Sequence, residues 1–335
     1  MEPVTHALTS LMLARAGQKY LPATGTVMLV IAGVAPDLDY LSYFGGPSAF
    51  LHFHRTLLHS LPGAVLLACI VAIIFFMIGR EYVDSEIRFL PAFAVCAFGI
   101  AAHLALDLAG EVGVRLIWPF RHAWTAYDLA ANLDPWILLI LALGILLPEL
   151  VRLVSEEIGD RKHGARGQRT ALVFLLIFLA YFGTRAELHR STIALLNSRE
   201  YHGLPPLATG AFPTALSPFR WRAVVSTDNT IEEKEISLAP GSPFDPDRMV
   251  THYKPQASAA LDAAQMTETA KKFLTYARFP VATGGAEHNG YRFVLRDLRF
   301  PLNDTRPDNV VAVVELSTTL AETQQELLYA NTLNR

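Results

Sequence analysis

Four long apolar runs constrain what this chain can fold into. They cover residues 61–79, 89–106, 136–150 and 171–182. A transmembrane helix needs about 20 mainly apolar residues, and a shorter run can still span a bilayer when its polar ends reach the interface. The chain is also 52% hydrophobic and only 18% charged, which is too apolar for an average soluble protein. The sequence therefore predicts a protein that crosses the membrane several times.

Two weaker segments precede these runs, at residues 3–16 and 24–35. A signal peptide carries its positive charge before the apolar region. Here Arg15 and Lys19 follow the first segment, so we expect no cleavage. An antiparallel helical pair, with its turn within residues 18–23, fits better. We expect about six helices in total.

The chain changes in character after about Tyr201. Prolines mark residues 191–215 as a linker, and alternating patterns after it predict strands at residues 221–227, 231–238, 291–300 and 310–318, with a helix at 258–276. The predicted fold is an all-α polytopic membrane domain (residues 1–190) followed by a small extramembrane α+β domain (residues 216–335).

Basic residues orient the membrane domain. Cytoplasmic loops are enriched in lysine and arginine. The loop over residues 152–169 is therefore predicted to be cytoplasmic; its basic residues include Arg161, Lys162, Arg166 and Arg169. The opposite side then receives the N-terminus, the connection 37–60, the loop 107–134 and the C-terminal domain, which we expect to be extracytoplasmic.

Histidines and carboxylates gather in the segments that this topology brings to the outer side. Residues 52–60 carry three histidines and an arginine immediately before an apolar run, and polar groups in such a position usually have a partner or a function. His103 and Asp107 are four residues apart, so a helix puts both on one face. Imidazole and carboxylate ligands suit zinc, manganese or iron. The metal ligands that we predict are His6, Asp39, His54, His59, His103 and Asp107.

Each of these residues also has a simpler interpretation. His103 with Asp107 fits an intramembrane hydrogen-bonded pair, and Asp39 fits the end of a turn. The metal interpretation depends on the set, because separate segments bring acceptors to one membrane face. The formal net charge of −3 gives no sign of a nucleic acid partner, and we expect none.

The order of these pieces resembles the YdjM/YbcI-type family of predicted membrane-bound metal-dependent hydrolases. Leu58 departs from the family, which often has threonine before the second histidine. The resemblance covers about the first 140 residues and implies a metal-dependent hydrolase of the bacterial inner membrane. That family is similar in motif layout to zinc-dependent phospholipase C and P1 nuclease, which implies a phosphoesterase centre with several zinc ions. The matching pieces are Thr5-His6, Pro36-Asp37-Leu38-Asp39, His54-Arg55 through His59-Ser60, His103 with Asp107, and Leu116 to Phe120.

A mechanism follows from the same residues. A metal-bound water with its pKa lowered to about 7 would attack a phosphoester or ester bond, with Asp37 or Glu111 as general base. Arg55 would hold a phosphate oxygen. A site at headgroup level favours a membrane lipid or a lipid-linked substrate. Two alternatives stay open: a membrane transporter, and a scaffold in which zinc or manganese only staples the helices.

Overall fold

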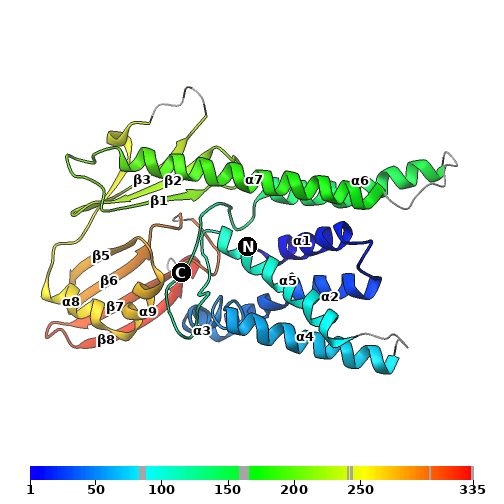
Figure 1. The fold of residues 1–335 in the computed structure, drawn as a ribbon. Coiled ribbons are helices and arrows are strands. Elements are labelled where there is room, and N and C mark those ends of the chain that lie inside the picture. Colours follow the sequence, from blue (N-terminus) through cyan, green and yellow to red (C-terminus); the bar gives the residue numbers. More distant parts are fainter. Residues whose placement is uncertain (83–87, 158–165, 240, 242–243, 302, 333–335) are drawn as a thin grey trace. The chain divides into compact units, whose positions relative to one another are not determined.

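The computed structural model describes residues 1–82, 88–157, 166–239, 241, 244–301 and 303–332 (Figure 1). Contacts divide the chain into two compact units. The helical unit comprises Met1–Asp39, Arg55–Glu187 and Ala215–Pro218. The sheet unit comprises Tyr40–His54, Leu188–Thr214 and Phe219–Arg335. Arg161 and Lys162, which oriented the membrane domain, lie outside the described residues.

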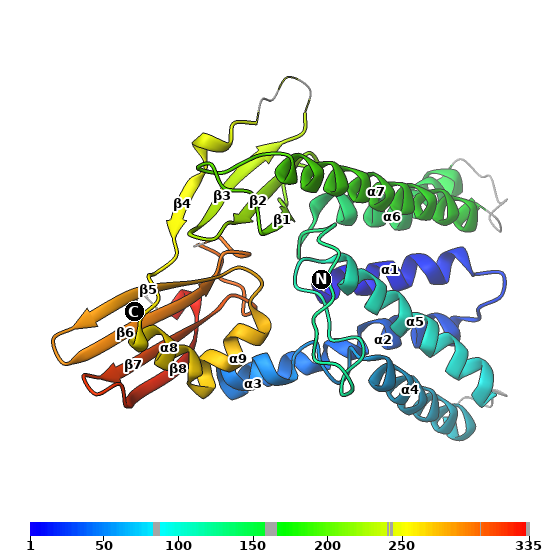
Figure 2. The same ribbon diagram turned by 60° about the vertical axis from the view of Figure 1, so that its left-hand side comes forward.

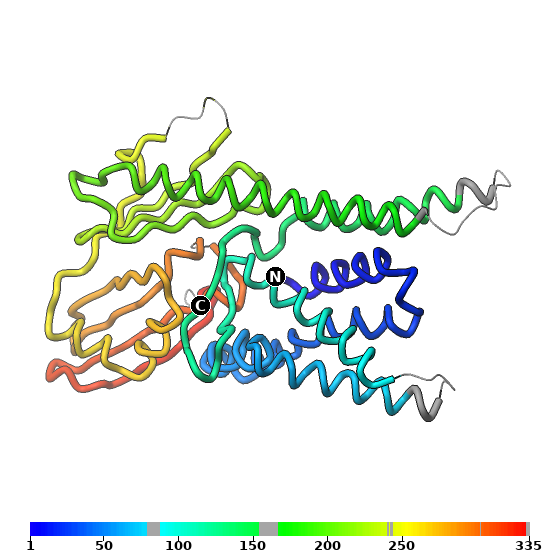
Figure 3. The backbone as a smooth tube through the Cα atoms, viewed as in Figure 1, coloured from blue at the N-terminus to red at the C-terminus, as the bar shows by residue number. Residues whose placement is uncertain are grey.

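The helical unit is built from long apolar helices (Figure 1). They are α1 (Pro3–Ala16), α2 (Ala23–Val34), α4 (Leu61–Tyr82), α5 (Phe89–Ala109), α6 (Pro135–Glu157) and α7 (Arg166–Asn197). The predicted N-terminal pair is present: in the tube view of Figure 3 the chain runs out along α1 and returns along α2. Within the described ranges, five segments are long and apolar enough to cross a membrane: Ala23–Phe53, Leu61–Ile78, Phe89–Ala109, Pro135–Leu153 and Gly167–Asn197.

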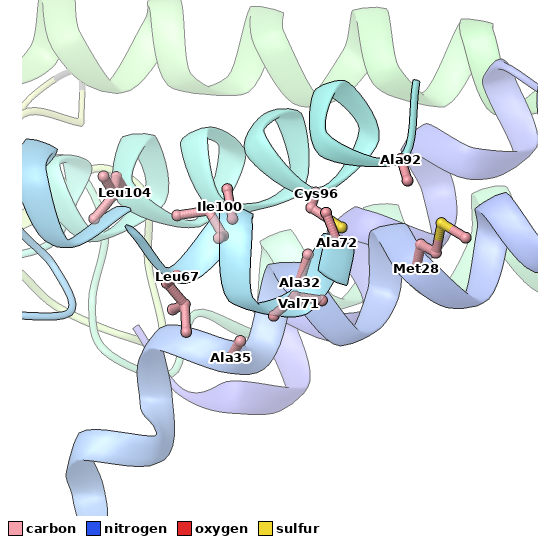
Figure 4. Close-up of a cluster of buried hydrophobic side chains, with 11 residues drawn as sticks. Met28, Ala32, Ala35, Leu67, Val71, Ala72, Ala92, Cys96, Ile100 and Leu104 are labelled. Carbon is pink, nitrogen blue, oxygen red and sulfur yellow. The ribbon is translucent and has the colours of Figure 1, made fainter. Parts of the chain in front are cut away.

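Buried apolar side chains, many of them alanine, fill the space between α2, α4 and α5, and other apolar side chains face outward. On α4, Val65 and Leu66 are 58% and 57% exposed, as expected for side chains that meet lipid rather than protein. Gly99 of α5 allows the closest approach, since a Cβ there would lie 2.8 Å from the carbonyl oxygen of Leu29 on α2. The side chains labelled in Figure 4 are Met28, Ala32, Ala35, Leu67, Val71, Ala72, Ala92, Cys96, Ile100 and Leu104.

Asp134 joins α6 to α7. Its Oδ1 accepts a hydrogen bond from the backbone N–H of Trp136 (3.0 Å), and its Oδ2 accepts one from the hydroxyl of Tyr181 on α7 (2.9 Å). The sequence predicts this N-cap, with Pro135 at the first helical position. A single carboxylate therefore satisfies a helix end and connects two helices.

The sheet unit contains two four-stranded antiparallel sheets, ordered β1-β2-β3-β4 and β5-β6-β7-β8 (Figure 2). The strands of the first sheet are β1 (Ala208–Pro213), β2 (Arg220–Ser226), β3 (Thr230–Ser237) and β4 (Val250–Tyr253). Those of the second are β5 (Pro280–Glu287), β6 (Gly290–Asp297), β7 (Val310–Ser317) and β8 (Glu322–Tyr329). Helices α8 (Ala259–Met266) and α9 (Glu268–Tyr276) lie between the two sheets in sequence, and the unit also includes α3 (Gly46–Phe53).

The predicted architecture is confirmed: an all-α membrane domain of about six helices precedes a smaller α+β domain. Two details differ. Helix α7 continues to Asn197 and β1 pairs with β2, so much of the segment predicted as a linker is ordered secondary structure. The single helix predicted at 258–276 is two helices, because Thr267 ends α8 and its hydroxyl caps the start of α9.

Candidate metal centre

The site is centred on Asp107, a fully buried carboxylate in the last turn of α5. Three imidazoles surround it. Its Oδ1 lies 3.4 Å from Nε2 of His6, and its Oδ2 lies 3.1 Å from Nε2 of His59 and 3.4 Å from Nε2 of His103. The i, i+4 spacing of His103 and Asp107 therefore places both on one helix face, as the sequence predicts.

Two cationic groups also contact Asp107. The Met1 amino group donates a hydrogen bond to its Oδ1, and Nη1 of Arg55 lies 3.6 Å from the same oxygen. Arg55 is almost fully buried and has φ of 55°, in the left-handed region that is uncommon for a side chain of its size. A buried carboxylate is costly unless it is compensated, and these groups supply the compensation.

Hydrogen bonds to the far side of two imidazoles aim their Nε2 atoms at each other. Nδ1 of His59 lies 2.9 Å from Oδ2 of Asp39, a charged pair, and Nδ1 of His103 donates to the carbonyl oxygen of Gly33 (2.8 Å). This assignment follows from the acceptors, which fix the tautomer. The two Nε2 atoms then face each other at 3.1 Å. Two lone pairs at that distance need a cation between or beside them.

The electrostatics of His59 lead to the same conclusion. Burial alone lowers the pKa of this imidazole, but the carboxylates of Asp39 and Asp107 outweigh it and raise the pKa to about 9. The environment therefore favours positive charge beside Nε2. A proton supplies that charge in the metal-free protein, and a divalent metal can take its place.

His6 and Asp37 extend the cluster. The His6 ring stacks on the His103 ring, with centroids 3.7 Å apart, and Oδ1 of Asp37 lies 3.8 Å from Nε2 of His103. Both residues are buried. Among the described residues, Nδ1 of His6 and Oδ2 of Asp37 have no hydrogen-bond partner. Buried polar atoms are costly in that state, so these atoms also fit a centre that takes a metal.

Two groups within the described ranges have the geometry to hold an ion: His6 with Asp37 and His103, and His59 with His103 and Asp107. In each group the donor atoms lie within 4.8 Å of one another. Nitrogen and oxygen donors without thiolates suit zinc and other borderline or hard divalent metals. The residues present therefore fit the metal that the sequence predicts.

Three predicted site residues take positions that sequence spacing did not indicate. Asp39 lies behind His59, bonded to its Nδ1, and is in neither ligand group. Glu111 is buried but follows the end of α5 at Ala109, so it does not continue the helical face of Asp107. His54 belongs to the sheet unit, where its ring stacks on Phe50 with centroids 4.4 Å apart.

Two functional groups escaped the sequence-based prediction. The Met1 amino group and the Gly33 carbonyl are backbone groups, and no side-chain motif reveals them. The sequence signal for the second is the glycine at position 99, which lets α2 and α5 approach closely where Gly33 meets His103.

The fold and the site together define an integral membrane protein with a buried histidine and carboxylate cluster in its helical unit. Comparison with known families adds a specific assignment: residues 1–189 match the model of the YdjM inner membrane protein family, and the chain belongs to that family. This confirms the resemblance noted in the sequence and the membrane character. The more distant similarity to zinc-dependent phospholipase C and P1 nuclease stays a prediction.

One relative is similar over a shorter range. It is a protein of Bacillus subtilis (strain 168) described as "Uncharacterized protein YfhP", which is 25% identical over 116 residues. The aligned part is 34% of this chain and 34% of that protein, so the chain matches about a third of the relative's length. No solved structure matches the chain.

Proposed function

We propose that this protein is a membrane-bound metal-dependent hydrolase that cleaves a phosphoester or ester bond of a lipid or lipid-linked substrate. The observation that carries the proposal is the convergence of the His59 and His103 Nε2 atoms on the buried Asp107 carboxylate. A divalent metal bound there would lower the pKa of a coordinated water to about 7 and so supply a nucleophile. Zinc suits the donor set best, and manganese is the alternative.

Buried histidines and carboxylates of the cluster would bind and orient the metal. Ligands for the metal would come from His6, His59, His103 and Asp107. Asp39 lies beside Nδ1 of His59 and so leaves Nε2 as the ligating atom, an arrangement common around ligating histidines.

Arg55, Asp37 and Glu111 are the proposed catalytic residues. The Arg55 guanidinium lies 3.6 Å from Asp107 and suits a phosphate oxygen, since its planar fork makes paired hydrogen bonds. The buried Asp37 carboxylate, next to His103, is the first candidate to accept the proton of the attacking water. Glu111 is the second candidate for that role.

Exposure along the site's own segments supports a lipid as the substrate. Leu38 is 59% exposed between the buried Asp37 and Asp39, and Leu57 is 41% exposed between the buried Arg55 and His59. Apolar side chains therefore emerge directly beside the site. In a membrane protein such exposed leucines meet hydrocarbon, so a lipid can approach the polar cluster without leaving the bilayer.

We also propose that the site and the C-terminal domain are extracytoplasmic. The support is the basic character of the segment before α7, which includes Arg166 and Arg169. α7 then carries the chain across to the opposite side. The location that we propose, near the membrane surface, favours hydrolysis over transport, because transport sites usually lie near the bilayer midplane on interrupted helices.

The metal content of the purified protein tests whether the candidate centre binds a metal. We would purify the protein in detergent, reconstitute it with zinc or manganese, and compare the wild type with the variant His103→Ala, Asp107→Ala and with His122→Ala, which changes an exposed histidine of the same unit. We expect stoichiometric metal in the wild type and in His122→Ala, and none in the double variant. A folded wild type that binds neither ion contradicts the mechanism.

Activity is tested separately. The metal-loaded protein would be incubated with phospholipids and with phosphodiester substrates, with Arg55→Ala as a comparison. Hydrolysis that depends on metal and falls in Arg55→Ala supports the proposal. A protein that binds metal but hydrolyses none of these substrates contradicts the phosphoesterase function. It favours the alternative of a non-catalytic scaffold in which the metal only holds the helices together.

A further inference from the structure

One segment of the chain belongs to a different unit from the residues on either side of it. Residues Tyr40–His54, here called the inserted segment, cluster with the sheet unit, whereas their neighbours Asp39 and Arg55 belong to the helical unit. The segment contains the last part of a 3-10 helix (Ala35–Gly45) and α3. Both of its ends therefore continue directly into the candidate metal centre.

Aromatic contacts hold the segment against the end of β8. The Tyr43 ring stacks on the Tyr329 ring, with centroids 5.0 Å apart and planes at 27°, and the Tyr329 hydroxyl donates a hydrogen bond to the carbonyl oxygen of Tyr43 (3.4 Å). The buried Phe50 of α3 meets the same Tyr329 ring edge-on at 6.2 Å. Aromatic pairs of this kind contribute about 0.5–1.5 kcal/mol each beyond their buried area.

A polar contact holds the other end of the segment. Nε2 of His54 lies 3.8 Å from Oδ1 of Asp308, and both side chains are only 3% exposed. The His54 ring is also enclosed by Phe50 and by Tyr40, whose centroid is 4.3 Å away. Asp308 is itself fixed, because its carbonyl oxygen accepts a hydrogen bond from the Tyr276 hydroxyl of α9 (2.7 Å).

The two ends of the segment meet at one carboxylate oxygen. Oδ2 of Asp39 accepts a hydrogen bond from the backbone N–H of Arg55 (2.8 Å) and lies 2.9 Å from Nδ1 of His59. The Arg55 backbone bond fixes the position of the same carboxylate oxygen that faces His59. Any loosening of the inserted segment therefore acts on the group that sets the direction of His59 Nε2.

We infer that Asp308 and Tyr329 are positioning residues for the metal centre, because they hold the inserted segment, whose flanking residues Asp39 and Arg55 are hydrogen-bonded to each other beside His59. The inference rests on the metal centre of the proposed function but not on the hydrolysis. Coupling of this kind is reciprocal. The contacts of Asp308 and Tyr329 with the segment strengthen metal binding, and bound metal in turn stabilises these contacts.

The first experiment measures metal affinity by competition with a chromogenic chelator. The variants are His54→Ala, Asp308→Asn and Tyr329→Ala. The matched controls are His52→Ala, an exposed histidine of the same segment, and Glu326→Gln, an exposed charge on β8. We expect affinity to fall 10–100-fold in the three variants, the range typical of partners that orient ligating histidines, with unchanged stoichiometry. Wild-type affinity in all three variants, measured on folded protein, overturns the inference.

A double variant separates positioning from direct ligation by His54. If His54 acts through Asp308, the loss in His54→Ala with Asp308→Asn equals that of the larger single variant, because both changes break one contact. If His54 is itself a ligand, His54→Ala lowers the stoichiometry while Asp308→Asn leaves metal binding intact. That second result overturns the inference.

Hydrogen exchange tests the same inference without metal. The Arg55 amide is bonded to Asp39, so its exchange reports whether the segment is closed. We expect Asp308→Asn and Tyr329→Ala to speed exchange in peptides covering residues 55–60 in the apoprotein, and expect the two controls not to. Tyr329→Phe retains the ring and should keep most of the protection. Unchanged exchange overturns the inference even if the wild type binds no metal, a result that by itself contradicts only the proposed function.

Discussion

Asp39 illustrates how one side chain can matter to a candidate metal centre without belonging to either ligand group. Its Oδ2 lies 2.9 Å from Nδ1 of His59, whose Nε2 is directed at Asp107 and His103. The same oxygen binds the Arg55 backbone, so the carboxylate connects a ligand to the loop that precedes it. Removing it frees both the tautomer and the ring orientation of His59.

We therefore expect Asp39→Ala to weaken metal affinity 10–100-fold while a saturating metal concentration still fills the site. Asp39→Asn keeps an acceptor oxygen and should lose less. Titration of metal against a competing chelator measures both variants, with Glu149→Gln as a control on a half-exposed carboxylate of α6. A site that stays empty at saturation in Asp39→Ala would instead make Asp39 a direct ligand.

The sequence predicted the residues of this site better than their roles. The spacing of His103 and Asp107 on one helix was sufficient to pair them. His54 and His59 are equivalent in a sequence motif, but the left-handed backbone at Arg55 (φ 55°) separates their surroundings. Their roles therefore depend on a local backbone conformation and on tertiary packing, and neither is encoded in residue spacing.

At the level of helices, the contact between α2 and α5 sets the geometry behind His103. Gly99 lies one turn before His103, and a Cβ on it would come within 2.8 Å of the Leu29 carbonyl oxygen and 3.3 Å of the Ala32 Cβ. Because backbone cannot rotate away as a side chain can, α2 and α5 would have to separate. The hydrogen bond from His103 to the Gly33 carbonyl would lengthen as they do.

We expect Gly99→Ala to destabilise the protein by about 1–3 kcal/mol, the usual cost of overpacking, and to weaken metal affinity as well. Gly183→Ala on α7 is the matched control, because no heavy atom lies within 4 Å of the added Cβ. Thermal unfolding in detergent gives the stability, and chelator competition gives the affinity. Equal unfolding temperatures and equal metal affinities in the two alanine variants would contradict close packing at Gly99.

The cap of α6 allows a second test at this level. Asp134 accepts hydrogen bonds from the Trp136 backbone and from the Tyr181 hydroxyl. Asp134→Ala should cost about 1–2 kcal/mol as a lost N-cap, and Tyr181→Phe about 1 kcal/mol. Combined in one protein, the two changes should cost less than their sum, since both break one shared bond. Strictly additive losses would mean that the α6–α7 connection contributes nothing.

Elements with strong local signals were predictable, and those defined by pairing were not. Apolar length located α4 to α7, and alternation around the Asp228–Asn229 turn located β2 and β3. Strands β1, β4, β5 and β8 escaped prediction. β5 contains Gly284 and Gly285, and β4 is only four residues long, so their strand structure depends on hydrogen bonding to neighbours that sequence does not identify.

For the whole molecule, the proposed orientation makes a direct prediction about labelling. In a background with Cys69→Ala and Cys96→Ala, Glu287→Cys adds an exposed thiol in the sheet unit, and Lys19→Cys adds one between α1 and α2. In spheroplasts, a membrane-impermeant maleimide should label the first and should label the second only after permeabilisation. The reverse pattern would put the C-terminal domain in the cytoplasm.

A metal that binds only the folded chain must also stabilise it. The ligand groups come from α1, from the segment after α2, from the loop before α4 and from α5, so no short stretch of the unfolded chain can reproduce the site. By mass action, metal at 100 times its Kd then stabilises the protein by about 2.7 kcal/mol.

We therefore expect the thermal unfolding temperature to rise on addition of zinc and to fall again with a chelator in the wild type, and expect no response in His103→Ala. Because the two Nε2 atoms and Asp107 form one cluster, His59→Ala should respond as His103→Ala does, whereas the exposed His122→Ala should follow the wild type. A rise of equal size in His103→Ala would place the stabilising zinc elsewhere on the protein, and the buried cluster would then be a hydrogen-bonded network that holds the helices together.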